Sequence, residues 1–147
     1  MADESRKLPD EELHRVFRAA PFVRSVGIKL VTIGPGYCET VLRILPRHLQ
    51  QNGYVHAGVQ ATMADHTMGG AATTLAGSQE YILTAEFKIN FLRAATGERL
   101  RCKSSVLKPG SMLMVVESEV YCDEGDTSRL VSKATATMAV MTRNRKS

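Results

Sequence analysis

The residues best suited to chemistry lie between Asn52 and Asp65. The polar, glycine-containing segment 52–58 runs into a stretch of mostly small residues, in which Asp65 is the single acid before Glu80. Small residues on all sides are typical of a helix that is buried on most of its surface. Burying an ionised carboxylate costs several kcal/mol unless the charge is compensated. An isolated acid in such a helix is therefore a candidate for catalysis.

Other motifs of catalysis and cofactor binding are absent from the sequence. It contains no Gly-x-Ser-x-Gly elbow of a serine hydrolase, no P-loop and no dinucleotide fingerprint. His66 adjoins Asp65 but points about 100° away around a helix. A metal site built from Asp65, His66 and His56 is therefore not expected, and we predict no metal and no resident cofactor.

The hydrophobic pattern predicts the elements that hold these residues. A short amphipathic helix precedes Pro21, which ends it, and residues 28–33 and 37–44 form a hairpin. The central helix spans residues 57–75. Four strands follow, at residues 81–91, 99–107, 112–120 and 130–141. This order predicts an α+β fold in which an antiparallel sheet wraps around one long helix.

Period-two alternation assigns side chains to the faces of these strands. In the third strand, Thr84 falls on the polar face. One face of each of four strands is predicted to be mainly apolar: Cys38, Thr40, Leu42 and Ile44; Tyr81, Leu83, Ala85, Phe87, Ile89 and Phe91; Leu100, Cys102, Ser104 and Val106; Met112, Met114, Val116, Ser118 and Val120.

Composition narrows the class of protein. The chain has 147 residues, which favours one domain, at residues 21–142, between an N-terminal extension at 1–20 and a basic tail at 143–147. The net charge of +4 suits a phosphorylated ligand and is too diffuse to indicate nucleic acid. The least polar window, residues 55–76, contains His, Gln and Asp, so we expect no membrane span. Three cysteines without a CxxC pair indicate buried thiols in a reducing, cytoplasmic compartment.

The order of elements resembles the hotdog fold, and the motif resembles that of the phenylacetate-pathway (PaaI-type) acyl-CoA thioesterases. In that family an Asn is followed by His-Gly-Gly and then by an Asp seven residues after the last Gly. The matching residues here are Asn52, His56-Ala57-Gly58 and Asp65. The segments 89–93 and 108–111 resemble the end of that family's third strand and its following turn. The likeness covers roughly residues 21–141.

Two positions depart from the family pattern. Ala94 stands where proline is common, which affects the stiffness of a loop more than chemistry. Ala57 stands where the family usually has glycine. If this position needs a positive φ, alanine costs about 1 kcal/mol. If it needs only a donated N–H, alanine serves equally well.

The resemblance implies hydrolysis of acyl-CoA to a free acid and coenzyme A. The N–H groups of Ala57 and Gly58, at the positive end of a helix, would polarise the thioester carbonyl. Asp65 would act as a general base on water or as a nucleophile, and the sequence leaves this choice open. Supporting roles in placing the substrate or water fall to Asn52, His56 and Thr84. Structural roles are the alternative: a tight turn at Gly58 and a buried bridging acid at Asp65.

Coenzyme A enters only as part of the substrate and product. The residues that the resemblance assigns to its binding are Asn90, Phe91, Leu92, Arg93, Lys108, Pro109, Gly110 and Ser111. Asp65 lies about 11 Å along the helix from Ala57, which is too far for one carbonyl to meet both on a single chain. The family solves this with a dimer, so we expect a homo-oligomer with a dimer as its minimum and a tetramer favoured.

Two further readings belong to other classes. A non-catalytic hotdog module would bind acyl-CoA as a sensor or scaffold. A hotdog dehydratase or hydratase would pair a catalytic His with an acid in a sequence context that this chain lacks. The sequence does not distinguish between acyl chains.

Overall fold

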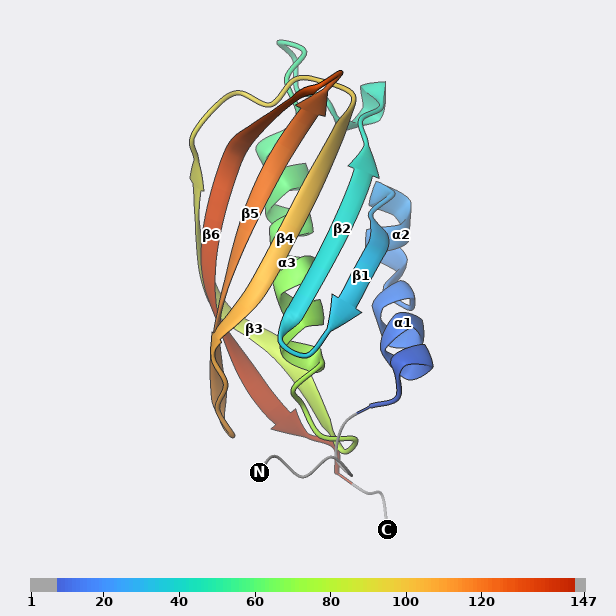
Figure 1. The fold of residues 1–147 in the computed structure, drawn as a ribbon, viewed down its shortest axis with the longest axis vertical. Coiled ribbons are helices and arrows are strands. Elements are labelled where there is room, and N and C mark those ends of the chain that lie inside the picture. Colours follow the sequence, from blue (N-terminus) through green and yellow to red (C-terminus); the bar gives the residue numbers. More distant parts are fainter. Residues whose placement is uncertain (1–7, 145–147) are drawn as a thin grey trace.

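A long antiparallel sheet curves around one helix in the computed structural model (Figure 1), which describes residues 8–144. The elements are α1 (Asp10–Arg18), α2 (Pro21–Val26), β1 (Lys29–Gly34), β2 (Tyr37–Arg43), η2 (Pro46–His48), α3 (Ala57–Thr73), β3 (Glu80–Phe91), β4 (Arg99–Lys108), β5 (Leu113–Glu124) and β6 (Thr127–Thr142). The six strands are ordered β1-β2-β4-β5-β6-β3. The expected α+β architecture is confirmed. The predicted basic tail lies partly outside the described residues, because these end at residue 144.

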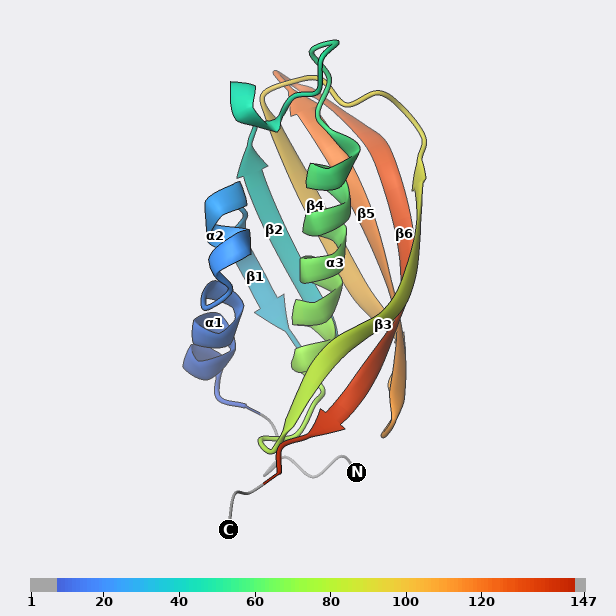
Figure 2. The same cartoon turned by 180° about the vertical axis from the view of Figure 1, so that it is seen from behind.

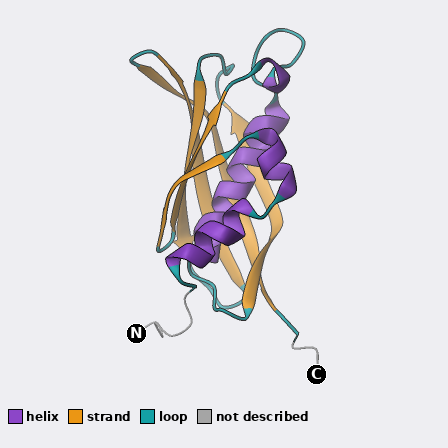
Figure 3. Ribbon diagram, turned by 90° about the vertical axis from the view of Figure 1, so that its right-hand side faces the viewer, coloured by secondary structure: helices purple, strands orange, loops and turns teal. Residues whose placement is uncertain are grey.

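The central helix α3 lies within the curve of the sheet, with strands on either side of it (Figures 2 and 3). Its residues Met63, Ala64, Thr67 and Met68 are fully buried. Gly70 shows how closely the layers approach, because a Cβ added there would meet the Cys38 Sγ at 2.9 Å and the Phe17 ring at 3.2 Å. The small residues of α3 thus let the sheet and α1 pack against the helix backbone.

The predicted inner faces of β2, β4 and β5 are largely confirmed. Cys38, Leu42, Leu100 and Cys102 are buried, as are the central residues of β5: Met114, Val116, Ser118 and Val120. Met112 is an exception: it precedes β5 and is 77 % exposed. The buried face of β5 therefore begins at Met114 and does not include Met112.

The predicted faces of β3 are wrong over half of the strand, because a bulge interrupts the alternation. Pairing with β6 shifts register between Thr84 and Glu86. Residues paired across an antiparallel ladder project to the same face. Thr84 pairs with the buried Met138, and Phe87 pairs with the buried Ala136. Both therefore face α3, although the sequence pattern placed them on opposite faces.

A second N-terminal helix was not predicted. Pro21 does end α1, but it also begins α2 at a position where proline is favoured. The first of these helices, α1, is tied to α3 by His66, whose Nε2 lies 3.1 Å from the Phe17 carbonyl oxygen. The rings of His66 and Phe17 are in contact, with their centroids 4.2 Å apart. Burial lowers the pKa of His66, so this contact is made by a neutral ring.

Candidate active site

The start of α3 is capped by the side chain of His56. Its Nδ1 accepts a hydrogen bond from the Gly58 N–H at 2.8 Å. A Cβ added at Gly58 would lie 3.0 Å from that nitrogen, so glycine leaves room for the ring. The His56 N–H in turn donates to the His48 carbonyl at 2.8 Å. In this chain, therefore, the Gly58 amide is occupied by the cap.

The neighbouring amide of Ala57 is the first of the helix. The first N–H groups of an α-helix have no acceptor within the helix and lie at its positive end. Among residues 8–144 a positive φ occurs only at glycines, so the alanine at position 57 brings no left-handed strain. Ala57 can therefore present a donor as well as glycine would.

The second half of the site is a pair formed by Asp65 and Thr84. The Thr84 hydroxyl donates to Asp65 Oδ1 at 2.6 Å, a short, charge-assisted bond. Asp65 is half-buried in the middle of α3, and Thr84 is exposed on β3. Thr84 pairs with the buried Met138 immediately before the bulge, so its side chain faces α3. Bulges are frequent beside functional groups.

An open cleft of about 500 Å³ joins the start of α3 to the end of β3. It is lined by the predicted residues His56, Ala57 and Phe91–Arg93. Arg93 is held there by a 3.0 Å bond from its guanidinium to the Leu130 carbonyl. The loop before α3 and the end of β3 thus form one surface.

Three glutamines that the sequence did not single out, Gln50, Gln51 and Gln60, also line this cleft. Gln50 takes the place there that was expected of Asn52, which is exposed and outside the lining. The Gln50 Oε1 accepts the Asn52 N–H and so shapes the loop. Gln60 is only 3 % exposed, and its Oε1 has no partner. The sequence feature that could have identified Gln60 is its long amide side chain among the small residues of the central helix.

Asn90 is exposed on β3 beside Phe91 but does not line this cleft. The other predicted residues of the coenzyme A site lie farther away. Lys108, Pro109, Gly110 and Ser111 form the β4–β5 turn, at the opposite end of the sheet from Arg93 (Figure 1). One chain therefore does not bring the two predicted halves of the coenzyme A site together.

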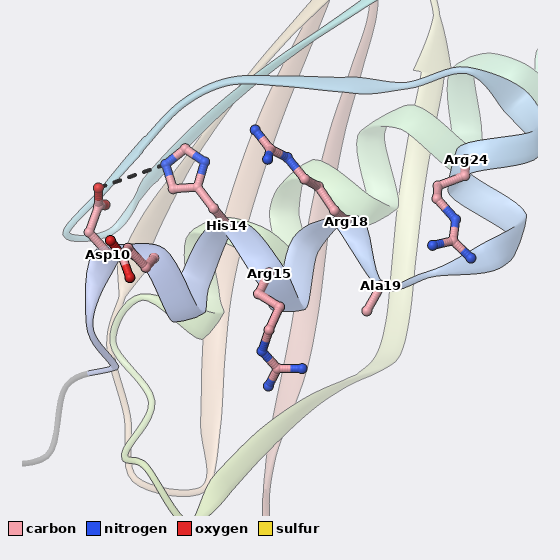
Figure 4. Close-up of a pocket in the computed structure, with 7 residues that line it drawn as sticks. Asp10, His14, Arg15, Arg18, Ala19 and Arg24 are labelled. Atoms are coloured by element: carbon pink, nitrogen blue, oxygen red, sulfur yellow. Dashed lines mark ion pairs between the residues drawn. The ribbon is translucent and has the colours of Figure 1, made fainter.

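Another cleft, of about 620 Å³, covers the outer side of α1 (Figure 4). Its charged side chains diverge: Arg15 pairs with Glu12, while Arg18 points the other way. His14 Nε2 lies 3.8 Å from an Asp10 carboxylate oxygen. No predicted site residue lines it, so it is not the candidate active site.

Within residues 8–144, His, Cys, Asp and Glu form no group of three that could hold a metal ion. The three cysteines are buried and free. Burial raises the pKa of Cys38 to about 12, so this thiol is no nucleophile. In the same part of the chain, no helix has the length and apolar character needed to cross a bilayer.

Known proteins resemble this chain in sequence and in fold. The family model described as the thioesterase superfamily matches residues 52–128, which is more than half of the chain. The structure of a thioesterase family protein from Silicibacter pomeroyi is 32% identical, with a TM-score of 0.87, and the match covers 90% of this chain and 97% of that one. A conserved protein of Pseudomonas aeruginosa is also 32% identical, with a TM-score of 0.78 over 90% and 100% of the two chains. A Saccharolobus solfataricus protein described as a candidate esterase is 25% identical over 118 residues, 80% of this chain and 84% of the relative.

Proposed function

The chain belongs to the thioesterase superfamily and has the hotdog fold, and from that premise we propose that it hydrolyses acyl-CoA thioesters with Asp65 as its catalytic carboxylate. The family supports thioester hydrolysis in general. The observation that carries the finer proposal is the 2.6 Å bond from Thr84 to Asp65, which holds a carboxylate beside the free edge of the sheet. The motif from His56 to Asp65 favours the PaaI-type branch of the family.

The edge strand β3 supports a dimer. It ends the strand order and pairs only with β6 among the described strands. Its side chains Leu83, Phe87 and Phe91 are 50%, 36% and 47% exposed. A long apolar edge is a liability that proteins normally cover. We infer that two copies join their β3 edges and cover these residues, as the minimum unit of a larger homo-oligomer such as a tetramer.

Such a dimer would complete the site. Asp65 lies on the side of α3 next to β3, as its bond to Thr84 requires. The Ala57 amide is two helical turns away along the same helix. In the proposed assembly the partner's helix start faces Asp65 across the joined edges. One subunit then supplies the amide and the other supplies the carboxylate.

The reaction follows from these two groups. The thioester oxygen accepts the Ala57 N–H, which stabilises the negative charge that develops in the transition state. As a general base, Asp65 takes a proton from the water that attacks the carbonyl carbon. As a nucleophile, it forms a mixed anhydride that water then cleaves. In both routes the carbon–sulfur bond breaks and coenzyme A leaves as a thiolate, which takes up a proton from the water that is consumed, while Thr84 holds the carboxylate in place.

The coenzyme A portion would lie along the open cleft near His56. Arg93 lies at the end of β3 and is suited to phosphate. The Lys108–Ser111 turn would come from another subunit of the oligomer, since it is far from Arg93 within one chain. The buried free thiols suit a reducing compartment, and we place the protein in the cytoplasm.

A thiol-release assay over short, medium, long and aromatic acyl-CoAs tests this proposal. We expect turnover by the native protein and a loss of about 100-fold or more in Asp65→Asn. Binding of acyl-CoA without thiol release would instead favour the sensor or scaffold. Full activity in Asp65→Asn would place the catalytic base or nucleophile elsewhere.

A further inference from the structure

A small apolar pocket of about 170 Å³ lies between α1, α3, β1 and β3. Its walls include Leu13 and Val16 from α1, Ile33 from β1 and Ile82 from β3. The floor of the pocket is formed by Gly69 and its neighbours on α3. The N-terminal extension therefore closes this pocket from one side.

The pocket begins one helical turn from the catalytic pair. Gly69 follows Asp65 by four residues, which places both on one side of α3 about 5–6 Å apart. Ile82 precedes Thr84 by two residues and shares its face of β3. A group attached to a carbonyl carbon at Asp65 would thus meet the pocket directly.

Gly69 keeps this space open. A Cβ added at Gly69 would find no atom within 4 Å, whereas one at Gly70 would collide with Cys38. A glycine inside a helix destabilises it by about 1 kcal/mol relative to alanine. Close packing explains the glycine at position 70. At position 69 no protein atom requires it, and the empty volume beside it belongs to the pocket.

The lining is uncharged. The imidazole of His66 is the single titratable side chain in it, and this ring is bonded through Nε2 to the Phe17 carbonyl. Burial lowers the pKa of His66, which keeps the ring neutral. The Thr73 hydroxyl is satisfied by the Gly69 carbonyl at 2.8 Å. Nothing in the lining compensates a carboxylate, and burying one unpaired is costly.

We propose that this pocket receives the acyl group of the substrate and restricts it to compact, uncharged groups of about six carbons. The inference rests on the proposed thioesterase function. The volume is close to that of the ~150 Å³ apolar cavity that takes up benzene in another protein. A dodecanoyl chain exceeds it, and a dicarboxylic acyl group would bring an unpaired charge into it.

Thiol release gives the first test, as kcat/KM for acetyl-, butyryl-, succinyl-, hexanoyl-, octanoyl- and dodecanoyl-CoA. We expect a maximum near hexanoyl-CoA and poor cleavage of succinyl-CoA relative to butyryl-CoA. Gly69→Leu fills the pocket and should lower the hexanoyl-to-acetyl ratio about tenfold or more. Val16→Ala widens it and should raise the octanoyl-to-hexanoyl ratio. Val31→Ala is the matched control, since Val31 is 53 % exposed and lies outside the lining.

Binding of benzene, followed by the amide NMR signal of Gly69, gives a readout that is independent of turnover. We expect benzene to shift this signal in the native protein and in Asp65→Asn, but not the corresponding signal in Gly69→Leu. An unshifted signal, an unchanged hexanoyl-to-acetyl ratio in Gly69→Leu, or equal cleavage of succinyl- and butyryl-CoA would overturn the acyl assignment while leaving thioester hydrolysis intact. Benzene binding in a protein that cleaves no acyl-CoA would instead refute the proposed function, and the acyl assignment with it.

Discussion

Replacing Thr84 by valine removes the hydrogen bond that its hydroxyl donates to the Asp65 carboxylate, with little change in side-chain shape. The Thr84 hydroxyl lies 2.6 Å from Asp65 Oδ1 and 3.4 Å from the Met138 sulfur. Valine keeps the contact with Met138 and loses only the donor. Hydrogen bonds to charged groups contribute about 1.5–3 kcal/mol. If the bond positions the carboxylate for the transition state, its loss should lower kcat/KM about 10- to 150-fold.

The assay is thiol release from the preferred acyl-CoA, with Thr84→Ser as the matched control. Serine retains the hydroxyl and should stay within about threefold of the native protein. Thermal unfolding of both variants checks that the fold is intact. Valine activity close to the native value would refute a positioning role for Thr84. Equal losses in valine and serine would show that the methyl group matters rather than the hydrogen bond.

Three further predictions address the helix cap, the interface and a buried ion pair. Gly58→Ala should push the His56 ring off the start of α3, because the new Cβ would lie 3.0 Å from Nδ1. We expect the free energy of unfolding in denaturant to fall by about 1 kcal/mol. An unchanged midpoint of the denaturant transition would contradict this. Leu83→Glu, at a half-exposed position on the outer face of the edge strand β3, should yield monomers in light scattering and abolish turnover, whereas an active dimer would refute the proposed interface. Burial disfavours the ionised form of Asp123, but hydrogen bonds, the strongest from Arg101, outweigh burial and lower its pKa to about 2. The ion pair therefore stabilises the fold fully above the unfolded pKa of about 3.9, and this stabilisation is lost as the pH falls toward 2. In Asp123→Asn, the free energy of unfolding should fall by about 1–2 kcal/mol less over this pH range than in the native protein. The same loss in both proteins would argue against the pair.

The sequence predicted the sheet where side-chain alternation is regular. Leu100 and Cys102 alternate with polar residues in β4, and both are buried as expected. The bulge at Thr84 could not be predicted in this way, since one extra residue reverses the faces without leaving a composition signal. Pro21 predicts the end of a helix, but proline is equally suited to begin one, as it does in α2.

The candidate site likewise contains residues that the sequence could predict and residues that it could not. Asp65 and His56 stand out because the residues around them in the sequence are mostly small and uncharged. The structure places Asp65 on α3 and His56 at its N-cap. Gln50 was missed because Asn52 occupies a similar place in the loop sequence. Only the three-dimensional path of the loop shows that Gln50, and not Asn52, lines the cleft.

Mixing two inactive variants tests the central claim most directly. Ala57→Pro removes the amide donor at the first position of α3, where proline fits the helix and the extended backbone of the preceding His56. Asp65→Asn removes the carboxylate. If each site combines the amide of one subunit with the acid of the other, co-refolded mixtures should regain roughly a quarter of the native activity, because a mixed dimer holds one intact site. Mixtures as inactive as their parents, with mixed dimers demonstrated by differential tags, would contradict a site shared between subunits.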